Sequence, residues 1–141
     1  MRQIKFRGKR IDTNEWIYGY PVKVVSSCGF GWNMHVPPAD PDDYHKVYPI
    51  KEPIEQFTGL KDKNGVEIYE GDIVKITDYK PGLYVVFWDE HRVAWWGKNI
   101  KRGRRDKQYD DDFYQLLGDC FQVTSREVVG NIHDDPELLD S

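Results

Sequence analysis

Turn residues recur at short intervals along this chain and divide it into brief runs that are apolar or that alternate apolar with polar residues. Gly, Pro, Asn and Asp supply most of these interruptions, and short runs bounded by such residues are typical of β-strands. Aromatic residues make up 14% of the sequence, which favours strands over helices because flat rings pack well on a pleated surface. Several short strands turned by Gly, Pro and Asn predict a small barrel or a sandwich.

The N-terminal segment predicts a β-hairpin. The stretch IKFRGKR alternates apolar with cationic residues, turn signals follow at 12–14, and a second alternating run contains Trp16, Tyr18 and Tyr20. We therefore expect two antiparallel strands at the start of the chain.

Residues 26–53 change character, with five Pro, three Asp and weak periodicity. They predict a loop with short strand pieces at 32–36 and 46–50. Binding residues are often found on long irregular stretches of compact domains, so this loop is a candidate binding segment.

More regular β character returns in the stretch GLKDKNGVEIYEGDIV, residues 59–74. A tight turn is predicted at 62–65, because Asn and Gly tolerate the positive φ that a hairpin turn requires. Gly71 is expected to let the strand bend or bulge. A further hairpin is predicted around 89–91.

The C-terminal part gives weaker signals. The stretch FYQLLGDCFQVT is compatible with a strand pair or with a short helix. A last strand is predicted in EVVGNI, followed by a helical turn with Asp135 as its N-cap and Pro136 at the first helical position.

Composition bounds the class of protein. A chain of 141 residues fits one ordinary domain, or a barrel-sized module with an elaborated N-terminal part. The net charge is −4, so the molecule as a whole does not attract nucleic acid, although a local patch could. Two distant cysteines favour free thiols over a disulfide. No export signal and no apolar run of about 20 residues is found, so we expect a cytoplasmic protein without a membrane span.

The acidic cluster at 62–72 raises the question of metal or acid–base chemistry. A calcium loop starting at Asp62 would need Gly at its sixth position, where Val66 stands instead. Glu67, Glu70 and Asp72 could act as a hydrolytic carboxylate pair, but their spacing supplies no environment that would raise a pKa, and turn carboxylates are common. We therefore favour a structural role for these carboxylates.

Other reactive patterns are missing from the sequence. The four histidines share no metal-ligand spacing, and neither a Gly-x-Ser-x-Gly elbow nor a phosphate loop occurs. We expect no enzymatic activity, no catalytic residue, no metal and no cofactor.

A basic segment at 98–107 is the candidate nucleic-acid contact. Cations next to aromatic rings suit a surface that contacts phosphates and stacks bases, although three Asp at 110–112 could neutralise the segment and charged hairpin tips are usually only solvated. The residues concerned are Trp95, Trp96, Lys98, Lys101, Arg102, Arg104, Arg105 and Lys107.

Three motifs in this order resemble the YopX-like family of phage and prophage proteins. They are IKFRGKR with EWIYG near the N-terminus, FTGLKDKNGVEIYEGDIV in the middle and REVVGNIHDDPELL at the end. The middle motif is long and specific, whereas the regions around 28–53 and 98–121 carry no family motif. The sequence also departs from the family pattern at 8–10, in the turn region of the first hairpin.

The resemblance implies a mostly β protein with few short helical turns. It implies an N-terminal β-region with a long irregular loop at 1–55, followed by an SH3-type β-barrel domain at 56–141, the two either separate or forming one compact unit. In such a barrel residues 59–74 form a turn at Gly65 and then a kink at Gly71 that enters the first barrel strand. Asp62 and Asn64 would hydrogen-bond the turn backbone.

The resemblance also implies self-association and carries no catalytic residue. Our first functional hypothesis is a non-enzymatic binding or assembly module that contacts its own copies or a host or phage protein, supported by aromatic residues expected to be exposed: Trp32, Trp95 and Trp96. The alternative is a nucleic-acid-binding module that uses the segment 98–107 with Trp95 or Trp96 as a stacking platform. A hydrolase that uses Glu67, Glu70 or Asp72 is the least favoured hypothesis.

Overall fold

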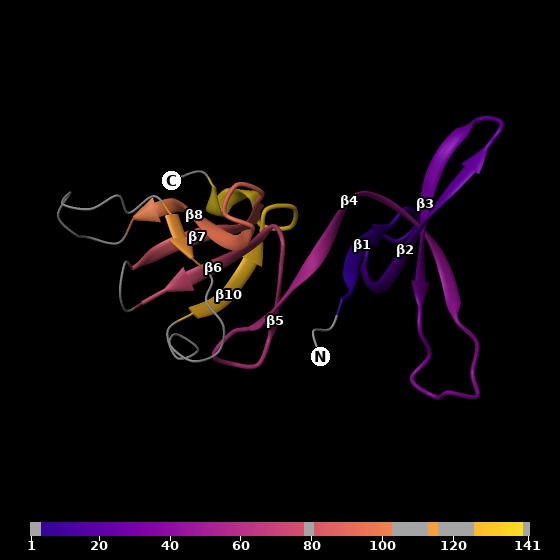
Figure 1. Ribbon diagram of the computed structural model, residues 1–141, viewed down its shortest axis with the longest axis horizontal. Coiled ribbons are helices and arrows are strands. Elements are labelled where there is room, and N and C mark those ends of the chain that lie inside the picture. The colour runs from indigo at the N-terminus through magenta and orange to yellow at the C-terminus, as the bar shows by residue number, and fades with distance from the viewer. Residues whose placement is uncertain (1–3, 78–80, 103–112, 116–125, 140–141) are drawn as a thin grey trace. The chain divides into compact units, whose positions relative to one another are not determined.

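The computed structural model describes residues 4–77, 81–102, 113–115 and 126–139 (Figure 1). These residues are mostly in β-strands, which form two five-stranded sheets. Contacts between residues divide the chain into two compact units, Met1–Phe57 (unit 1) and Thr58–Ser141 (unit 2). The elements in chain order are β1 (Phe6–Arg10), β2 (Trp16–Ser26), β3 (Gly29–Val36), β4 (Lys46–Lys61), β5 (Glu67–Tyr69), β6 (Asp72–Ile76), β7 (Gly82–Asp89), β8 (Ala94–Arg102), β9 (Phe113–Gln115), β10 (Arg126–Asn131) and the 3-10 turn η1 (Pro136–Leu138).

Unit 1 is built on two long strands that each change partner along their length. β2 pairs with β1 through 16–19 and with β3 through 20–26, and both pairings are antiparallel. β4 pairs with β3 through 46–50 and with β1 through 50–56. Because β1 pairs with both β2 and β4, the ladder of hydrogen-bonded strands returns on itself around this short strand.

A small core lies inside this arrangement. Met34 and Ile50 are buried, and a Cβ placed on Gly8 would lie 3.0 Å from Ile50 Cδ1. Gly8 therefore lets β1 approach the core closely. The predicted first hairpin is confirmed, with Asn14 at φ 60° in its turn and Arg10 N–H donating to Glu15 O at 2.9 Å.

The strand pieces predicted at 32–36 and 46–50 are confirmed within β3 and β4, but the prediction that the rest of 26–53 is loop is wrong. β3 and β4 occupy most of the segment, and only 27–28 and 37–45 contain no strand. β4 continues through Pro49 and Pro53 for 16 residues. Proline is tolerated in a strand where its missing N–H would face away from the neighbouring strand, so the prolines that indicated a loop did not end β4.

Unit 2 contains a second sheet with the order β10-β6-β7-β8-β9, together with β5, which pairs with β4. All four pairings within the second sheet are antiparallel. Alternating side chains of β6, β7 and β8 meet in one core with Ile68 of β5, and Leu60 and Val128 pack against it. The buried members of this core are Ile68, Val74, Ile76, Tyr84, Val86 and Trp95.

The predicted turn at 62–65 and the predicted kink at Gly71 of unit 2 are confirmed. Gly65 closes the β4–β5 turn at φ 79°, and its N–H donates to Asp62 O at 3.0 Å. Gly71 separates β5 from β6 at φ 83°, and its N–H donates to Val86 O at 2.9 Å. Both glycines adopt the left-handed conformation that other residues adopt at an energetic cost.

The chain ends in β10 and η1. Asp135 stands at the N-cap of η1 and Pro136 follows at the start of the turn, but the Asp135 side chain makes no capping bond to η1. Its carboxylate instead accepts the backbone N–H of Asn131 at 3.1 Å. Of the stretch FYQLLGDCFQVT, the first three residues form β9 and the remaining ones lie outside the described residues.

Candidate functional site

The most exposed regular structure of unit 1 is the far end of the β2–β3 hairpin, residues 22–31, which we call the arm. Every residue of the arm is exposed. In Figure 1 it extends as a two-stranded ribbon away from the other strands of unit 1. Strand β1 ends its pairing with β2 at Gly19, and β4 begins its pairing with β3 at Trp32, so among the described residues no third strand pairs with the arm.

One face of β2 carries a continuous row of exposed apolar side chains. Alternate residues of a strand point to the same face, so Tyr18, Tyr20, Val22 and Val24 lie in one line. Their side chains are between 43% and 48% exposed. An apolar row on one face of a strand is usually buried against the core, but this row is exposed.

The opposite face of the arm is mixed. Val25 and Phe30 are register partners and are exposed. The Lys23 ammonium lies 4.2 Å from the centre of the Phe30 ring, where the face of the ring attracts a cation. Lys23 is the only charged residue at 22–31, so the arm offers apolar surface and backbone groups rather than a charged patch.

The outer edge of β2 is open along the arm. Pro21 has no N–H, yet it pairs with Met34 of β3 without a break in register. A proline fits an unbroken ladder where its nitrogen faces away from the partner strand. Because backbone groups of alternate residues point to the same edge, those of Pro21, Lys23 and Val25 point to the edge that β3 does not cover.

The basic segment that the sequence singled out is only partly described. Trp95 is 6% exposed and belongs to the core of unit 2, so the expectation of an exposed Trp95 is wrong. A buried indole cannot serve as a stacking platform. The sequence missed its burial because Trp95 and Trp96 are neighbours in β8, and strand alternation turns one of them inward.

Trp96 and Trp32 are both partly exposed. Trp96 lies under the guanidinium of Arg92, 4.3 Å from the ring centre, and Trp32 donates its Nε1–H to Glu52 at 3.0 Å. Lys98 is exposed on β8, whose last two residues are Lys101 and Arg102. The remaining predicted contacts, Arg104, Arg105 and Lys107, lie outside the described residues.

The carboxylate of Asp62 holds the backbone of unit 2 in place. Asp62 is 2% exposed, and its Oδ1 accepts the N–H groups of Asn64 at 2.8 Å and Val66 at 2.9 Å. Its Oδ2 accepts the N–H of Val128 at 2.9 Å, which ties the β4–β5 turn to β10. Asn64 contributes its backbone N–H, and its side chain is exposed.

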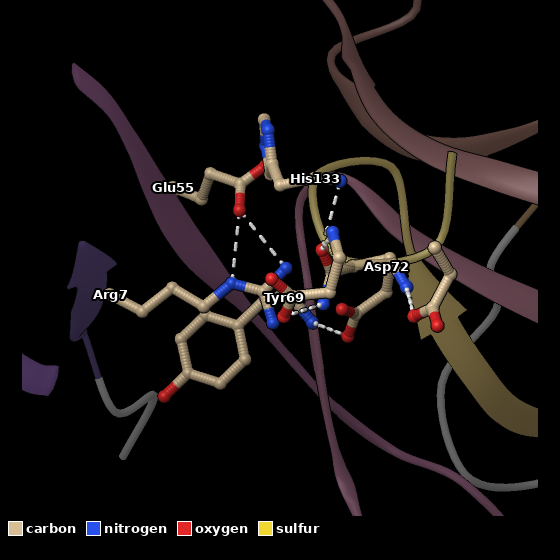
Figure 2. Close-up of polar contacts among 8 residues, drawn as sticks. Arg7, Glu55, Tyr69, Asp72 and His133 are labelled. Atoms are coloured by element: carbon tan, nitrogen blue, oxygen red, sulfur yellow. Dashed lines mark hydrogen bonds and ion pairs between the residues drawn. The ribbon is translucent and has the colours of Figure 1, made fainter. Parts of the chain in front are cut away.

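The other acidic candidates also make local contacts. Buried Asp72 accepts the backbone N–H of Tyr69 at 2.8 Å across the Gly71 kink (Figure 2). Glu67 accepts the Tyr69 hydroxyl at 3.2 Å, and Glu70 is half-buried. Asp62 and Asp72 are thus committed to backbone donors.

Unit 1 contains a buried ion pair. Arg7 Nε donates to Glu55 Oε1 at 3.0 Å, and both residues are buried (Figure 2). The pair joins β1 to β4, where Arg7 and Glu55 are register partners. The Arg7 guanidinium also lies 4.5 Å from the centre of the Trp16 ring on β2.

An exposed ion pair closes the first hairpin. Arg10 Nε donates to Asp12 Oδ1 at 2.9 Å and Arg10 Nη2 donates to Asp12 Oδ2 at 2.6 Å. Hydrogen bonding by the Arg10 side chain lowers the pKa of Asp12, and the same bond raises the pKa of Arg10. Both groups are at the surface, where such a pair contributes little to stability.

In the part of the chain that the structure describes, no group of three or more His, Cys, Asp or Glu is arranged to hold a metal ion. None of the described helices has the length and apolar character needed to cross a membrane.

Sequence reasoning named 26–53 as a candidate binding segment and did not single out the apolar row on β2. The row at Tyr18, Tyr20, Val22 and Val24 is visible as alternation in the sequence, and an acidic residue is missing from 16–39. Alternation alone indicates a strand with one apolar face. It cannot show that nothing covers that face.

Comparisons with known proteins address the chain as a whole. A family model described as YopX protein matches residues 5–140. Among solved structures, protein EF1440 from Enterococcus faecalis is similar at 22% sequence identity, with 99% of each chain covered and a TM-score of 0.46. No curated protein matches the chain.

Proposed function

Because the chain belongs to the YopX protein family, we propose that it is a non-enzymatic binding or assembly module that acts through protein–protein contacts. The observation that carries the proposal is the arm, a two-stranded ribbon of unit 1 whose residues are all exposed. An isolated two-stranded ribbon is marginally stable in water, and an open, apolar strand edge is a template for pairing with another chain. A ribbon of this kind is best explained by a partner that covers it.

The acidic residues support the non-enzymatic part of the proposal. A general acid or base needs a carboxyl that can reach a substrate and exchange a proton with it. Asp62 and Asp72 are buried and hold backbone N–H groups of their own turns. Their positions serve the geometry of the β4–β5 turn and of the kink at Gly71.

We propose that unit 2 is an SH3-type barrel, supported by five antiparallel strands around a single core, and that the protein self-associates through the arm. Membership of the family supports an origin in phage or prophage genomes, and the sequence composition supports a cytoplasmic location.

Nucleic-acid binding through 98–107 stays a prediction. Trp95 does not support it, because its ring is buried. Among the predicted contacts, exposed Lys98 and partly exposed Trp96 still support it. It predicts a mass increase with DNA that disappears at high salt, since phosphate contacts release counterions.

Light scattering on the purified chain tests the proposal. We expect a mass above the 16.6 kDa of one chain, and a return to 16.6 kDa when Val22→Ser and Val24→Ser are combined. The matched control combines Val66→Ser with Val129→Ser in unit 2, whose side chains are 48% and 39% exposed, and it should leave the mass unchanged. A wild-type mass of 16.6 kDa at every concentration would contradict self-association. The same measurement with added DNA, at low and at high salt, tests the nucleic-acid-binding alternative.

A further inference from the structure

We propose that the open edge of β2 pairs with the same edge of a second copy of the chain, antiparallel and with Val24 on the two-fold axis. The inference rests on the proposed function, since it names the partner and the register of the arm. It joins two two-stranded ribbons into one four-stranded sheet. Three or more strands with an apolar face are what a free-standing sheet needs for stability.

The open edge has the length and the backbone groups for this pairing. It runs from Tyr20, just beyond the last β1 pair at Gly19, to Ser26 at the turn. Backbone groups of alternate residues point to the same edge of a strand, and the position of Pro21 indicates which residues face the open edge. Lys23 and Val25 therefore point both their N–H and their C=O groups toward the open edge, whereas Pro21 has only a C=O to offer. The donors available to a second chain are therefore those of Lys23 and Val25.

Only one two-fold register satisfies these groups. With Val24 opposite Val24 of the other copy, Lys23 of each chain faces Val25 of the other, and both pairs exchange N–H and C=O groups. A register centred on Lys23 would set two ammonium groups opposite each other and would pair Val25 with Pro21, which has no N–H. A register centred on Val25 would bring Lys23 against Ser27, which lies in the turn.

The side chains agree with this register. On the face of Val24, each Val22 lies opposite Ser26 of the other copy, so the exposed apolar row of one chain continues into that of the other. On the opposite face, Val25 lies beside the methylene stem of Lys23 of the other copy. The ammonium of Lys23 is held over Phe30 of its own chain, 4.2 Å from the ring centre, which leaves the stem free to cover an apolar neighbour.

The charge of the arm favours a second copy over a charged partner. The arm carries one cation and no acidic residue, and this register keeps the two Lys23 side chains out of direct opposition. Two-fold symmetry also lets one strand supply both halves of the interface, which is the commonest arrangement among protein oligomers.

Engineered disulfides report the register directly. The background carries Cys28→Ser and Cys120→Ser. In the proposed register, Val24→Cys would place the thiols of the two copies opposite each other in a non-hydrogen-bonded pair, with Cα atoms about 4.5 Å apart. Disulfides form at Cα separations of about 4.4–6.8 Å. Val22→Cys is the matched control, equally exposed and on the same face, because its two copies would lie four positions apart, at about 13 Å.

We expect a covalent dimer from Val24→Cys in a glutathione redox buffer, none from Val22→Cys, and a covalent dimer again when Val22→Cys is combined with Ser26→Cys. A dimer by light scattering without the Val24 cross-link, or with equal cross-linking at Val22, would overturn this pairing and leave the proposed function standing. A monomer at every concentration would overturn both this pairing and the proposed self-association. Non-reducing electrophoresis and light scattering on the same samples separate these outcomes.

Discussion

Two strands of this protein contain runs of nearly the same composition in opposite surroundings. β2 contains Val22-Lys23-Val24-Val25 in unit 1, and β6 contains Ile73-Val74-Lys75-Ile76 in unit 2. In β6 every residue of this run except Lys75 is buried, whereas all four in β2 are exposed. The same combination of β-branched residues and one lysine therefore supports both a core strand and an open ribbon.

The difference lies in what each strand has beside it. β6 lies between β10 and β7, and Asp72 at its start accepts the N–H of Tyr69. β2 has β3 on one edge, and β1 leaves its other edge after Gly19. Neighbours that come from distant parts of the chain thus decide whether a strand is a core element or a contact surface.

The largest effect is expected at Asp62 of unit 2. Asp62→Ala removes the acceptor of three part-buried backbone N–H groups, and a donor left without a hydrogen-bond partner costs about 1–3 kcal/mol where water does not reach it. We expect the free energy of unfolding of unit 2 to fall by about 3 kcal/mol or more, measured by urea denaturation.

Asn64→Ala is the control in the same turn. The Asn64 side chain is exposed and only its backbone N–H takes part in the network, so the substitution should change stability by about 0.5 kcal/mol or less. Equal losses for the two variants would mean that the Asp62 carboxylate does not hold the turn.

The second prediction compares the two strands through one substitution. Val74 is 1% exposed and Val24 is 43% exposed. Val74→Ala should lower the free energy of unfolding by about 2 kcal/mol, because it leaves a cavity in the core. Val24→Ala should lower it by about 0.5 kcal/mol or less at a dilution where the chain is monomeric. Similar losses would show that the arm is packed as a core strand is.

Much of the fold could be predicted from local sequence. The positions of the first hairpin, of the Gly65 turn and of the Gly71 kink follow from residues that are themselves part of each turn. The full length of the strand at 46–61 could not be predicted beyond its first residues, because its two prolines indicate a loop unless the neighbouring strands are known. Pairing between distant segments sets those neighbours.

The candidate site shows the same limit. Trp95 and Trp96 are next to a basic segment, and that context predicted exposed rings. Alternation along β8 places Trp95 in the core, and only the position of the core determines which of the two rings turns inward. The apolar row on β2 was readable as a pattern, but its exposure depends on whether a distant segment of the chain covers that face.

A third prediction uses two glycines in strands. A Cβ on Gly97 of β8 would lie 2.8 Å from Tyr84 Cβ in the core, whereas nothing lies within 4 Å of a Cβ on Gly31 of the arm. Gly97→Ala should therefore lower the melting temperature, with a loss of about 1–2 kcal/mol from overpacking. Gly31→Ala should be neutral or slightly stabilising, because it reduces the entropy of the unfolded chain. A loss at Gly31 as large as at Gly97 would reveal a close neighbour of the arm.

The smallest effect is expected in the first hairpin of unit 1. Its turn contains the exposed carboxylate of Asp12, whereas the β4–β5 turn of unit 2 contains the buried carboxylate of Asp62. The Arg10 side chain lowers the pKa of Asp12 from its ordinary value of 3.8. A carboxyl whose pKa is depressed by folding stabilises the fold above its ordinary pKa, and this contribution is lost as the pH falls through the depressed value. The loss of stability should therefore begin below about pH 4, and it should be slight because the pair is at the surface.

NMR titration of the Asp12 carboxyl measures this directly. Arg10→Gln should return the pKa of Asp12 toward 3.8, since it removes the bidentate donor while the backbone N–H of Thr13 still bonds Asp12 Oδ1. Lys46→Gln removes the same charge from an exposed position in β4 and should leave the titration of Asp12 unchanged. If Asp12 titrated at 3.8 in the unmodified chain, the hairpin would be held by its backbone pairing alone, and the contrast with the carboxylate-held turn of unit 2 would be sharper still.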